Sequence, residues 1–171
     1  MSRPLRIAML AHSTNPRGGV VHAMHLSEAL AELDHQVTLF APDSTGTGFF
    51  RNPKVASQAF PVARAPSAMT AMVEQRIGDY VHFFERRGTR EFDLFHAHDG
   101  ISGNALATLA ERGHIGGFLR TVHHVDDFAD PKLMDLQARS IDAAVQLFTV
   151  SDHWSQYFRQ RGRVATCVGN G

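Results

Sequence analysis

The stretch that decides the fold lies near the start of the chain and reads Leu5-Arg6-Ile7-Ala8-Met9-Leu10-Ala11. It is short and mostly apolar, as a buried strand is, and the loop His12-Ser13-Thr14-Asn15-Pro16-Arg17-Gly18-Gly19 follows it. Beyond the loop, apolar residues recur with helical spacing at Ala23, Leu26, Leu30 and Leu33. These segments predict a strand, a loop and a helix, the opening of a parallel βαβ unit.

The same alternation continues along the chain. Further apolar runs typical of buried parallel strands are Val37–Ala41, Phe92–His96, Phe118–Val122, Leu147–Val150 and Val164–Val168, with a weak edge strand inside Val55–Pro66. Segments with helical periodicity lie between most of them, for example Val73, Ile77, Tyr80 and Phe84. Strands that alternate with helices predict a Rossmann-like, doubly wound parallel sheet with helices on both faces.

Composition limits the class of protein. The chain has 171 residues, of which 43% are hydrophobic and 20% charged, and this suits one domain over residues 1–171. Lys plus Arg and Asp plus Glu number 17 each, so the chain has no basic field of the kind that binds nucleic acid. No apolar run approaches bilayer length, and the single Cys167 cannot close an intramolecular disulfide. We therefore expect a cytoplasmic protein without a transmembrane segment, with Cys167 as a small core residue.

Histidines follow two of the predicted strands. In an open parallel sheet, ligands bind beyond the carboxyl ends of the strands. His96 and His98 share one face of their strand by alternation, and His123 follows the next strand. We expect His98 and His123 to lie near the glycine loop, whereas His96 and His124 are more typical of buried histidines with backbone partners.

The glycine loop has two interpretations. Gly18 and Gly19 open a predicted helix, whose unpaired N–H groups and dipole favour an anion such as phosphate. The other interpretation is a turn that needs a positive φ. The loop matches neither G-x-G-x-x-G nor G-x-x-x-x-G-K-[ST], which disfavours a dinucleotide site and a P-loop. Asp43, after the second predicted strand, is most simply a turn residue.

The histidines also allow a metal site. His96, His98, His123 and Asp126 could ligate the metal of a hydrolase. Against this, H-x-H at one strand end supplies only two ligands, and the sequence has neither H-E-x-x-H nor C-x-x-C. A non-catalytic module that binds nucleotides or sugar phosphates is a further alternative.

Several segments, in order along the chain, resemble the amino-terminal domain of the retaining GT-B glycosyltransferases of family 4. They are Pro16-Arg17-Gly18-Gly19-Val20 after the first strand, Phe92–Asp99 as the strand D-hydrophobic-hydrophobic-H-x-H, Thr121-Val122-His123 as T-x-H, and Thr149-Val150-Ser151 as V-S. Val168-Gly169-Asn170-Gly171 is similar to the P-N-G that leads into the second domain of that family, with Gly169 in place of proline.

The resemblance implies one half of a two-domain enzyme that uses a nucleotide-sugar donor and needs no metal or other cofactor. Gly18 and Gly19 would then touch the donor phosphates, and His123 and His98 would be the catalytic residues. The resemblance further implies that Asn15, Asp99 and His124 contact the acceptor, which would be a small molecule, a glycan or a lipid-linked molecule. The family's acidic E-x7-E motif belongs to a carboxyl-terminal domain that is absent from this chain, so we expect the isolated domain to be inactive.

Overall fold

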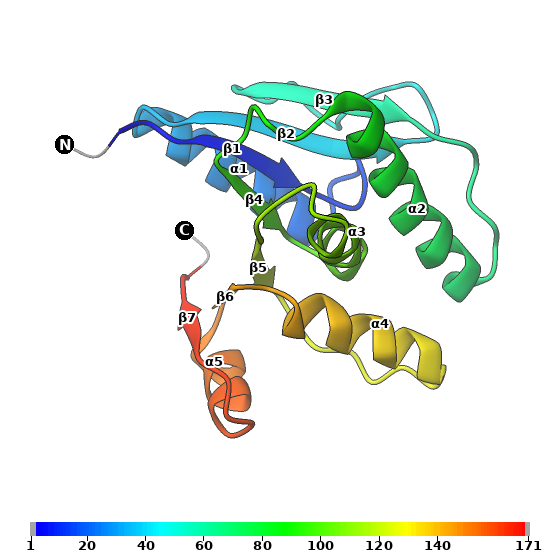
Figure 1. Cartoon of the computed structure of the whole chain (residues 1–171), viewed down its shortest axis with the longest axis vertical. Coiled ribbons are helices and arrows are strands. Elements are labelled where there is room, and N and C mark those ends of the chain that lie inside the picture. The colour runs from blue at the N-terminus through cyan, green and yellow to red at the C-terminus, as the bar shows by residue number, and fades with distance from the viewer. Residues whose placement is uncertain (1–2, 170–171) are drawn as a thin grey trace.

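The computed structural model describes residues 3–169, which form a seven-stranded parallel sheet (Figure 1). The strands are β1 (Arg6–Leu10), β2 (Gln36–Asp43), β3 (Ala56–Pro61), β4 (Leu94–Ala97), β5 (Leu119–Val122), β6 (Gln146–Thr149) and β7 (Ala165–Cys167). Their order is β3-β2-β1-β4-β5-β6-β7, and every neighbouring pair is parallel. The order reverses between β1 and β4, which is where doubly wound sheets bind ligands. The predicted Rossmann-like class is confirmed.

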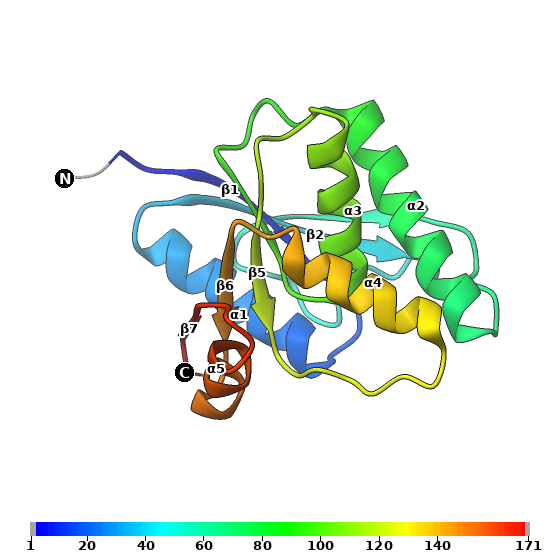
Figure 2. The ribbon, with the colours of Figure 1, turned by 60° about the horizontal axis from the view of Figure 1, so that its bottom comes forward.

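Helices cover both faces of the sheet (Figure 2). The helices are α1 (Gly18–Glu32), α2 (Met69–Arg87), α3 (Gly100–Glu111), α4 (Pro131–Asp142) and α5 (Asp152–Arg159). Helix α1 packs with β1 and β2 in one hydrophobic cluster, whereas buried residues of α2, α3, α4 and α5 belong to a second cluster. The division follows from right-handed crossovers, because the chain moves in one direction from β1 to β2 and in the other from β3 onwards.

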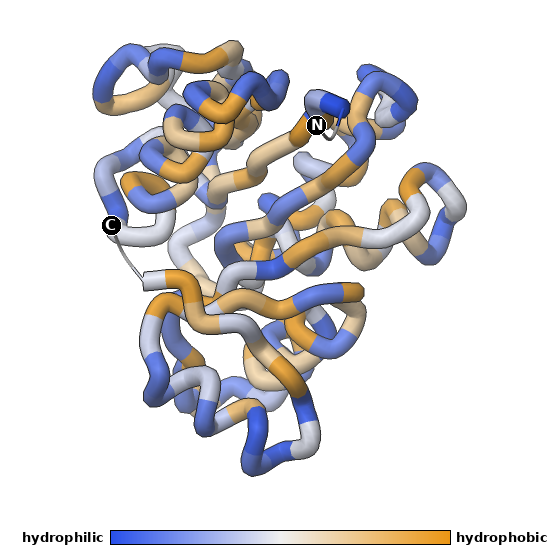
Figure 3. The backbone as a smooth tube through the Cα atoms, turned by 90° about the vertical axis from the view of Figure 1, so that its left-hand side faces the viewer, coloured by the Kyte–Doolittle hydropathy of each residue, from blue (hydrophilic) through white to orange (hydrophobic). Residues whose placement is uncertain are grey.

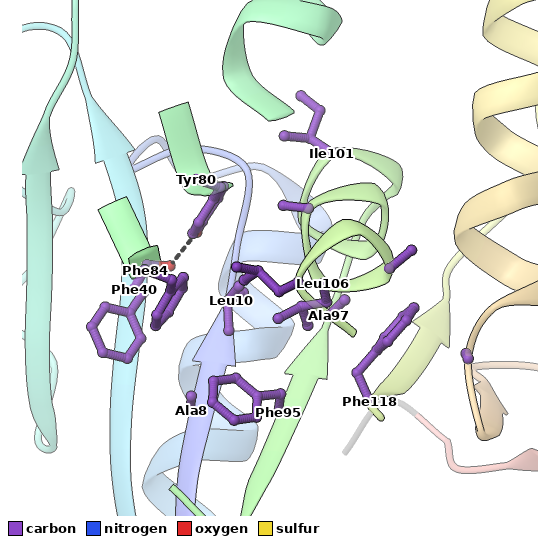
Figure 4. Close-up of a cluster of buried hydrophobic side chains, with 14 of the residues drawn as sticks. Ala8, Leu10, Phe40, Tyr80, Phe84, Phe95, Ala97, Ile101, Leu106 and Phe118 are labelled. Carbon is purple, nitrogen blue, oxygen red and sulfur yellow. Dashed lines mark hydrogen bonds between the residues drawn. The ribbon is translucent and has the colours of Figure 1, made fainter. Parts of the chain in front are cut away.

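The larger core is rich in aromatic rings (Figure 4). Tyr80, Phe40 and Phe84 are almost completely buried, and the rings of Phe40 and Phe84 meet edge to face with centroids 5.1 Å apart. The Tyr80 hydroxyl lies 2.6 Å from the carbonyl oxygen of Ala11 and 2.9 Å from that of Phe40, and donates to this pair of acceptors. It thereby ties α2 to the end of β1, directly before the glycine loop.

Two expectations about burial are wrong. Cys167 is exposed, because β7 is a three-residue strand at the edge of the sheet and leaves its last residues uncovered. Leu33 is 69% exposed, because α1 ends at Glu32 and Leu33 is its C-cap rather than part of its buried face. The residues Asn170 and Gly171 of the P-N-G-like segment lie outside the described residues.

Hydropathy follows this architecture. Hydrophobic stretches run along the central strands, and the most hydrophilic stretches lie at outer turns (Figure 3). Among the described residues, no helix combines the length and the apolar character needed to cross a membrane.

Candidate functional site

The first turn of α1 comes close to the ends of β4 and β5 through Gly19. A Cβ atom at Gly19 would lie 3.5 Å from Cδ2 of His123 and 3.6 Å from the carbonyl oxygen of His98, whereas nothing lies within 4 Å of one at Gly18. Neither glycine has a positive φ, so the turn interpretation is wrong. The helix α1 instead begins beside the imidazole of His123, with room for no more than a small side chain at Gly19.

Four histidine rings meet at this carboxyl edge of the sheet. His96 and His98, from the end of β4, stack with centroids 4.4 Å apart. His123, which follows β5, lies 5.8 Å from His98 and 4.9 Å from His22 between ring centroids. The structure thus brings together His98, His123 and Gly19, as the strand ends predict. The ring of His22 also belongs to this group, although the strand ends do not predict it. Its position one helical turn after Gly19 indicates that it lies on the same face of the helix.

Side chains from neighbouring strands orient two of these rings. His96 is 6% exposed, and its Nε2 lies 2.8 Å from Oγ1 of Thr121 on β5. Its partner is therefore a side-chain hydroxyl and not the backbone group expected. Nε2 of His98 lies 2.9 Å from Sδ of Met9 on β1. A thioether sulfur only accepts hydrogen bonds, so Nε2 of His98 carries the hydrogen and Nδ1 the lone pair.

The rings of His96, His98 and His123 are held in the neutral form. Burial lowers the pKa of His96 to about 3 and that of His123 to about 4, and it holds the pKa of His98 well below its usual value. The positive charge of Arg120 acts in the same direction on each ring. Because a neutral imidazole offers one donor and one acceptor, the cluster can hydrogen-bond to hydroxyl groups of a ligand.

Some buried nitrogens here lack protein partners. Nδ1 of His98, Nε2 of His123 and Nε of Arg120 have no hydrogen-bond partner within residues 3–169. A buried polar atom left unpaired costs about 1–3 kcal/mol, so folded proteins rarely keep several of them in one place without a function. The two histidine rings lie 5.8 Å apart at the strand ends, which marks this edge as a place where a ligand would complete the hydrogen bonding.

Asp99 connects this edge to the glycine loop. Its Oδ1 accepts a hydrogen bond from the backbone N–H of Ser102 at 2.7 Å, which caps α3. Its Oδ2 lies 3.7 Å from Nδ1 of His12, the first residue of the loop. Asn15 is exposed further along that loop, where its carbonyl oxygen accepts from the N–H of Arg17 at 2.8 Å.

The family model described as glycosyltransferase family 4 matches residues 16–171. The chain belongs to glycosyltransferase family 4. Among curated proteins, no match to this glycosyltransferase family 4 chain is found.

Solved structures show the same fold. A sucrose-phosphate synthase from Thermosynechococcus elongatus is 18% identical with a TM-score of 0.67, covering 97% of this chain and 89% of that one. UDP-N-acetylglucosamine 2-epimerase from Rickettsia bellii is 13% identical with a TM-score of 0.65, covering 98% and 45%. Phytolacca americana UGT2, complexed with UDP-2fluoro-glucose and pterostilbene, is 10% identical with a TM-score of 0.66, covering 98% and 54%. This family 4 chain spans about half the length of the epimerase and of UGT2.

Two of the expected residues of this family 4 chain, His124 and Asp126, lie in the loop after β5 and have exposed side chains. His124 has a side chain that is 66% exposed, and its Nε2 lies 3.2 Å from Oδ2 of Asp126. Gln137 holds the backbone of Asp126 through two hydrogen bonds of 2.8 Å. The expectation of a buried His124 is therefore wrong. The metal ligand set that includes Asp126 is not assembled either, and no group of three or more His, Cys, Asp or Glu residues within residues 3–169 is arranged to hold a metal ion.

The loop after β2 is joined to the glycine loop of this family 4 chain, since the backbone N–H of Phe50 donates to the carbonyl oxygen of Thr14 at 3.0 Å. Asp43 accepts hydrogen bonds from the N–H groups of Thr45, Gly46 and Gly48, and these outweigh burial and lower its pKa to about 2. Its structural environment is thus that of the turn residue expected. Arg51 donates to both carboxylate oxygens of Glu28 on α1, at 2.6 and 2.9 Å.

Proposed function

We propose that this chain is the acceptor-side domain of a retaining glycosyltransferase that moves a sugar from a nucleotide-sugar to a small-molecule, glycan or lipid-linked acceptor. Membership of family 4 supports the transferase activity. The observation that carries the assignment of the site is the nearness of Gly19 to His123, since a Cβ atom at Gly19 would lie 3.5 Å from Cδ2 of that ring. It places the start of a helix, which attracts anions, against a neutral imidazole, which binds hydroxyl groups.

The start of α1 supplies the proposed contact to the donor diphosphate. Its N-cap is Arg17, whose side chain makes no capping hydrogen bond, so the first-turn amides keep their donors for a ligand. Those donors and the positive end of the helix dipole favour the negative charge that grows on the departing diphosphate. No side chain at Gly18 or Gly19 separates the phosphates from this backbone.

The neutral histidines would orient hydroxyl groups. Nδ1 of His98 is a buried acceptor without a partner, and Nε2 of His123 is likewise unpaired within the described residues. A hydroxyl group of the sugar or acceptor would complete either one. In the proposed retaining reaction, the departing phosphate takes the acceptor proton while the new glycosidic bond forms on the face that the diphosphate leaves. The protein then contributes mainly orientation, and no metal or other cofactor is needed.

The proposal is tested in the protein made from its complete native reading frame. We expect His123→Ala and Gly19→Leu each to lower sugar transfer about a hundredfold or more. His123→Ala removes a side chain that orients the sugar or acceptor, and the leucine of Gly19→Leu occupies the space proposed for the donor phosphates. His25→Ala, at an exposed position of the same helix, is the matched control. Circular dichroism would verify that each variant is folded.

Two outcomes would contradict the proposal. Transfer at the wild-type rate in both variants would remove the site assignment. Saturable binding of nucleotides in calorimetry, without any turnover of nucleotide-sugars by the complete protein, would favour the non-catalytic binding module instead.

A further inference from the structure

His12 differs from the other histidines near Gly19 because it faces a carboxylate. Its Nδ1 lies 3.7 Å from Oδ2 of Asp99, whereas His96 and His98 face a hydroxyl group and a thioether. The His12 side chain is 34% exposed, so it is open to a ligand. Within residues 3–169, no protein group makes a hydrogen bond to its Nε2.

The charged groups around His12 come from three elements. Asp99 approaches from the end of β4, Arg17 from the start of α1, and Arg120 from β5. Burial and the two arginines disfavour a positive imidazole, but the carboxylate of Asp99 outweighs them and raises the pKa of His12 above its ordinary value. His12 therefore takes up a proton more readily than the neutral rings of His96, His98 and His123 beside it.

The negative charge of Asp99 is already balanced on its other side. Its Oδ1 caps α3, and the buried Arg120 stabilises its ionised form. The start of α3 lies close to Arg120, since a Cβ atom at Gly103 would lie 3.3 Å from Cδ of Arg120. Asp99 can thus orient His12 through Nδ1. Because Arg120 offsets the negative charge of Asp99, this carboxylate repels an anion at His12 less strongly.

We propose that His12, oriented by Asp99, is an anion-binding residue that contacts a phosphate or carboxylate group of the ligand through Nε2. This inference rests on the proposed function and extends it from backbone contacts at Gly18 and Gly19 to a charged side chain. The anion is either the diphosphate of the donor or an acidic group of the acceptor. Asp99 is a positioning residue in this arrangement.

The test measures binding of inorganic pyrophosphate to the complete protein by isothermal titration calorimetry. At pH 6, His12→Gln should bind about tenfold more weakly than the wild type, a loss of about 1.4 kcal/mol, because a hydrogen bond between charged groups is replaced by a neutral one. His12→Lys keeps the charge and should retain most of the affinity. His114→Gln is the matched control, since its Nε2 also faces a carboxylate, Glu85 at 3.4 Å, but at the opposite edge of the sheet.

The pH dependence separates a charged contact from a merely structural role. Pyrophosphate itself changes charge with pH, and this affects the wild type and His12→Lys equally. We therefore compare the ratio of their affinities, from which the contribution of pyrophosphate cancels. This ratio should fall as the pH rises through the pKa of His12, because the imidazole loses its proton while the lysine keeps its own. In an Asp99→Asn background the fall should occur at lower pH, although asparagine still caps α3. An unchanged profile would contradict the role of Asp99.

A second arm identifies the source of the anion. The titration is repeated after the protein is saturated with UDP, ADP or GDP. Loss of the binding that depends on His12 would assign His12 to the donor diphosphate, and its persistence would assign it to an acidic group of the acceptor.

Three outcomes decide the inference. No pyrophosphate binding by the wild type, or equal binding by the wild type and His12→Gln, overturns it. If His12→Gln binds normally while Gly19→Leu has lost sugar transfer, the inference fails and the proposed function stands. If the complete wild-type protein transfers no sugar from any nucleotide-sugar, the proposed function fails, whatever the result for His12.

Discussion

At the amino edge of the sheet, charged side chains are paired with side chains of opposite charge. At the carboxyl edge, buried histidine nitrogens have no hydrogen-bond partner within the described residues. Asp93, before β4, accepts from the backbone N–H of Arg6 at 2.9 Å and from its guanidinium at 2.8 and 3.1 Å. Arg112 and Glu85 pair at 2.6 Å between α3 and α2 at the same edge. At the other edge, Nδ1 of His98 and Nε2 of His123 are buried without partners within residues 3–169.

The difference separates groups whose hydrogen bonds are completed within the protein from groups that could still bind a ligand. Completed pairs contribute to folding and have no capacity left for a substrate. Unpaired buried groups destabilise the folded state and keep the capacity to bind a substrate. Substitutions at the two edges should therefore have opposite consequences for stability and for activity.

The largest effect is expected for His98→Phe at the carboxyl edge. We expect sugar transfer by the complete protein to fall about a hundredfold, because the unfilled acceptor Nδ1 is lost. The melting temperature should stay the same or rise, since an apolar ring replaces a buried imidazole with an unpaired nitrogen. Turnover assays and thermal unfolding check both halves. A marked loss of stability would show that His98 supports the fold and would break the comparison.

A second prediction concerns Tyr80, which connects the core to the carboxyl edge. Tyr80→Phe removes the donor that the carbonyl oxygens of Ala11 and Phe40 share, so the free energy of unfolding should fall by about 1–3 kcal/mol. Chemical denaturation measures this change, with Phe83→Leu as a reference for an ordinary packing defect. A Tyr80→Phe variant as stable as the wild type would show that water replaces the hydroxyl.

The fold and part of the site were predictable from sequence because they depend on local patterns. Strand and helix periodicity gave the sheet, and the position of His98 and His123 just after their strands placed both near Gly19. His22 and the pair of His12 with Asp99 were missed, because they depend on how α1 and α3 are set against the sheet. His124 turned outward for a similar reason, since Gln137 on α4 fixes the loop that carries it.

A third prediction tests the amino edge through pH. The guanidinium and backbone N–H of Arg6 hold the pKa of Asp93 well below its usual range. A carboxyl group with a lowered pKa stabilises the fold above its unfolded pKa of about 3.9, and this contribution is lost as the pH falls through the folded pKa. Asp93→Asn should therefore lower the melting temperature at pH 7, and the difference from wild type should shrink in acid. Sugar transfer at 25 °C should be unaffected; reduced transfer by a folded variant would contradict the separation of the two edges.

The smallest effect is expected for Gly19→Ala, and it tests why a glycine stands at the point where the carboxyl edge meets α1. A methyl group there would lie 3.5 Å from His123, which is ordinary van der Waals contact, and the φ of Gly19 is not positive. Alanine should therefore fold at least as well as glycine, with a gain of at most about 1 kcal/mol from its higher helix propensity. It should raise the KM for the donor a few-fold and leave kcat nearly unchanged, because the methyl group only reduces the space through which the donor phosphates reach the backbone of α1. Gly19→Ala could instead abolish transfer, as Gly19→Leu is expected to do. The phosphates would then have to lie directly against the Cα atom of Gly19, and the space available to them would be smaller than the distance between a methyl group at Gly19 and His123 indicates.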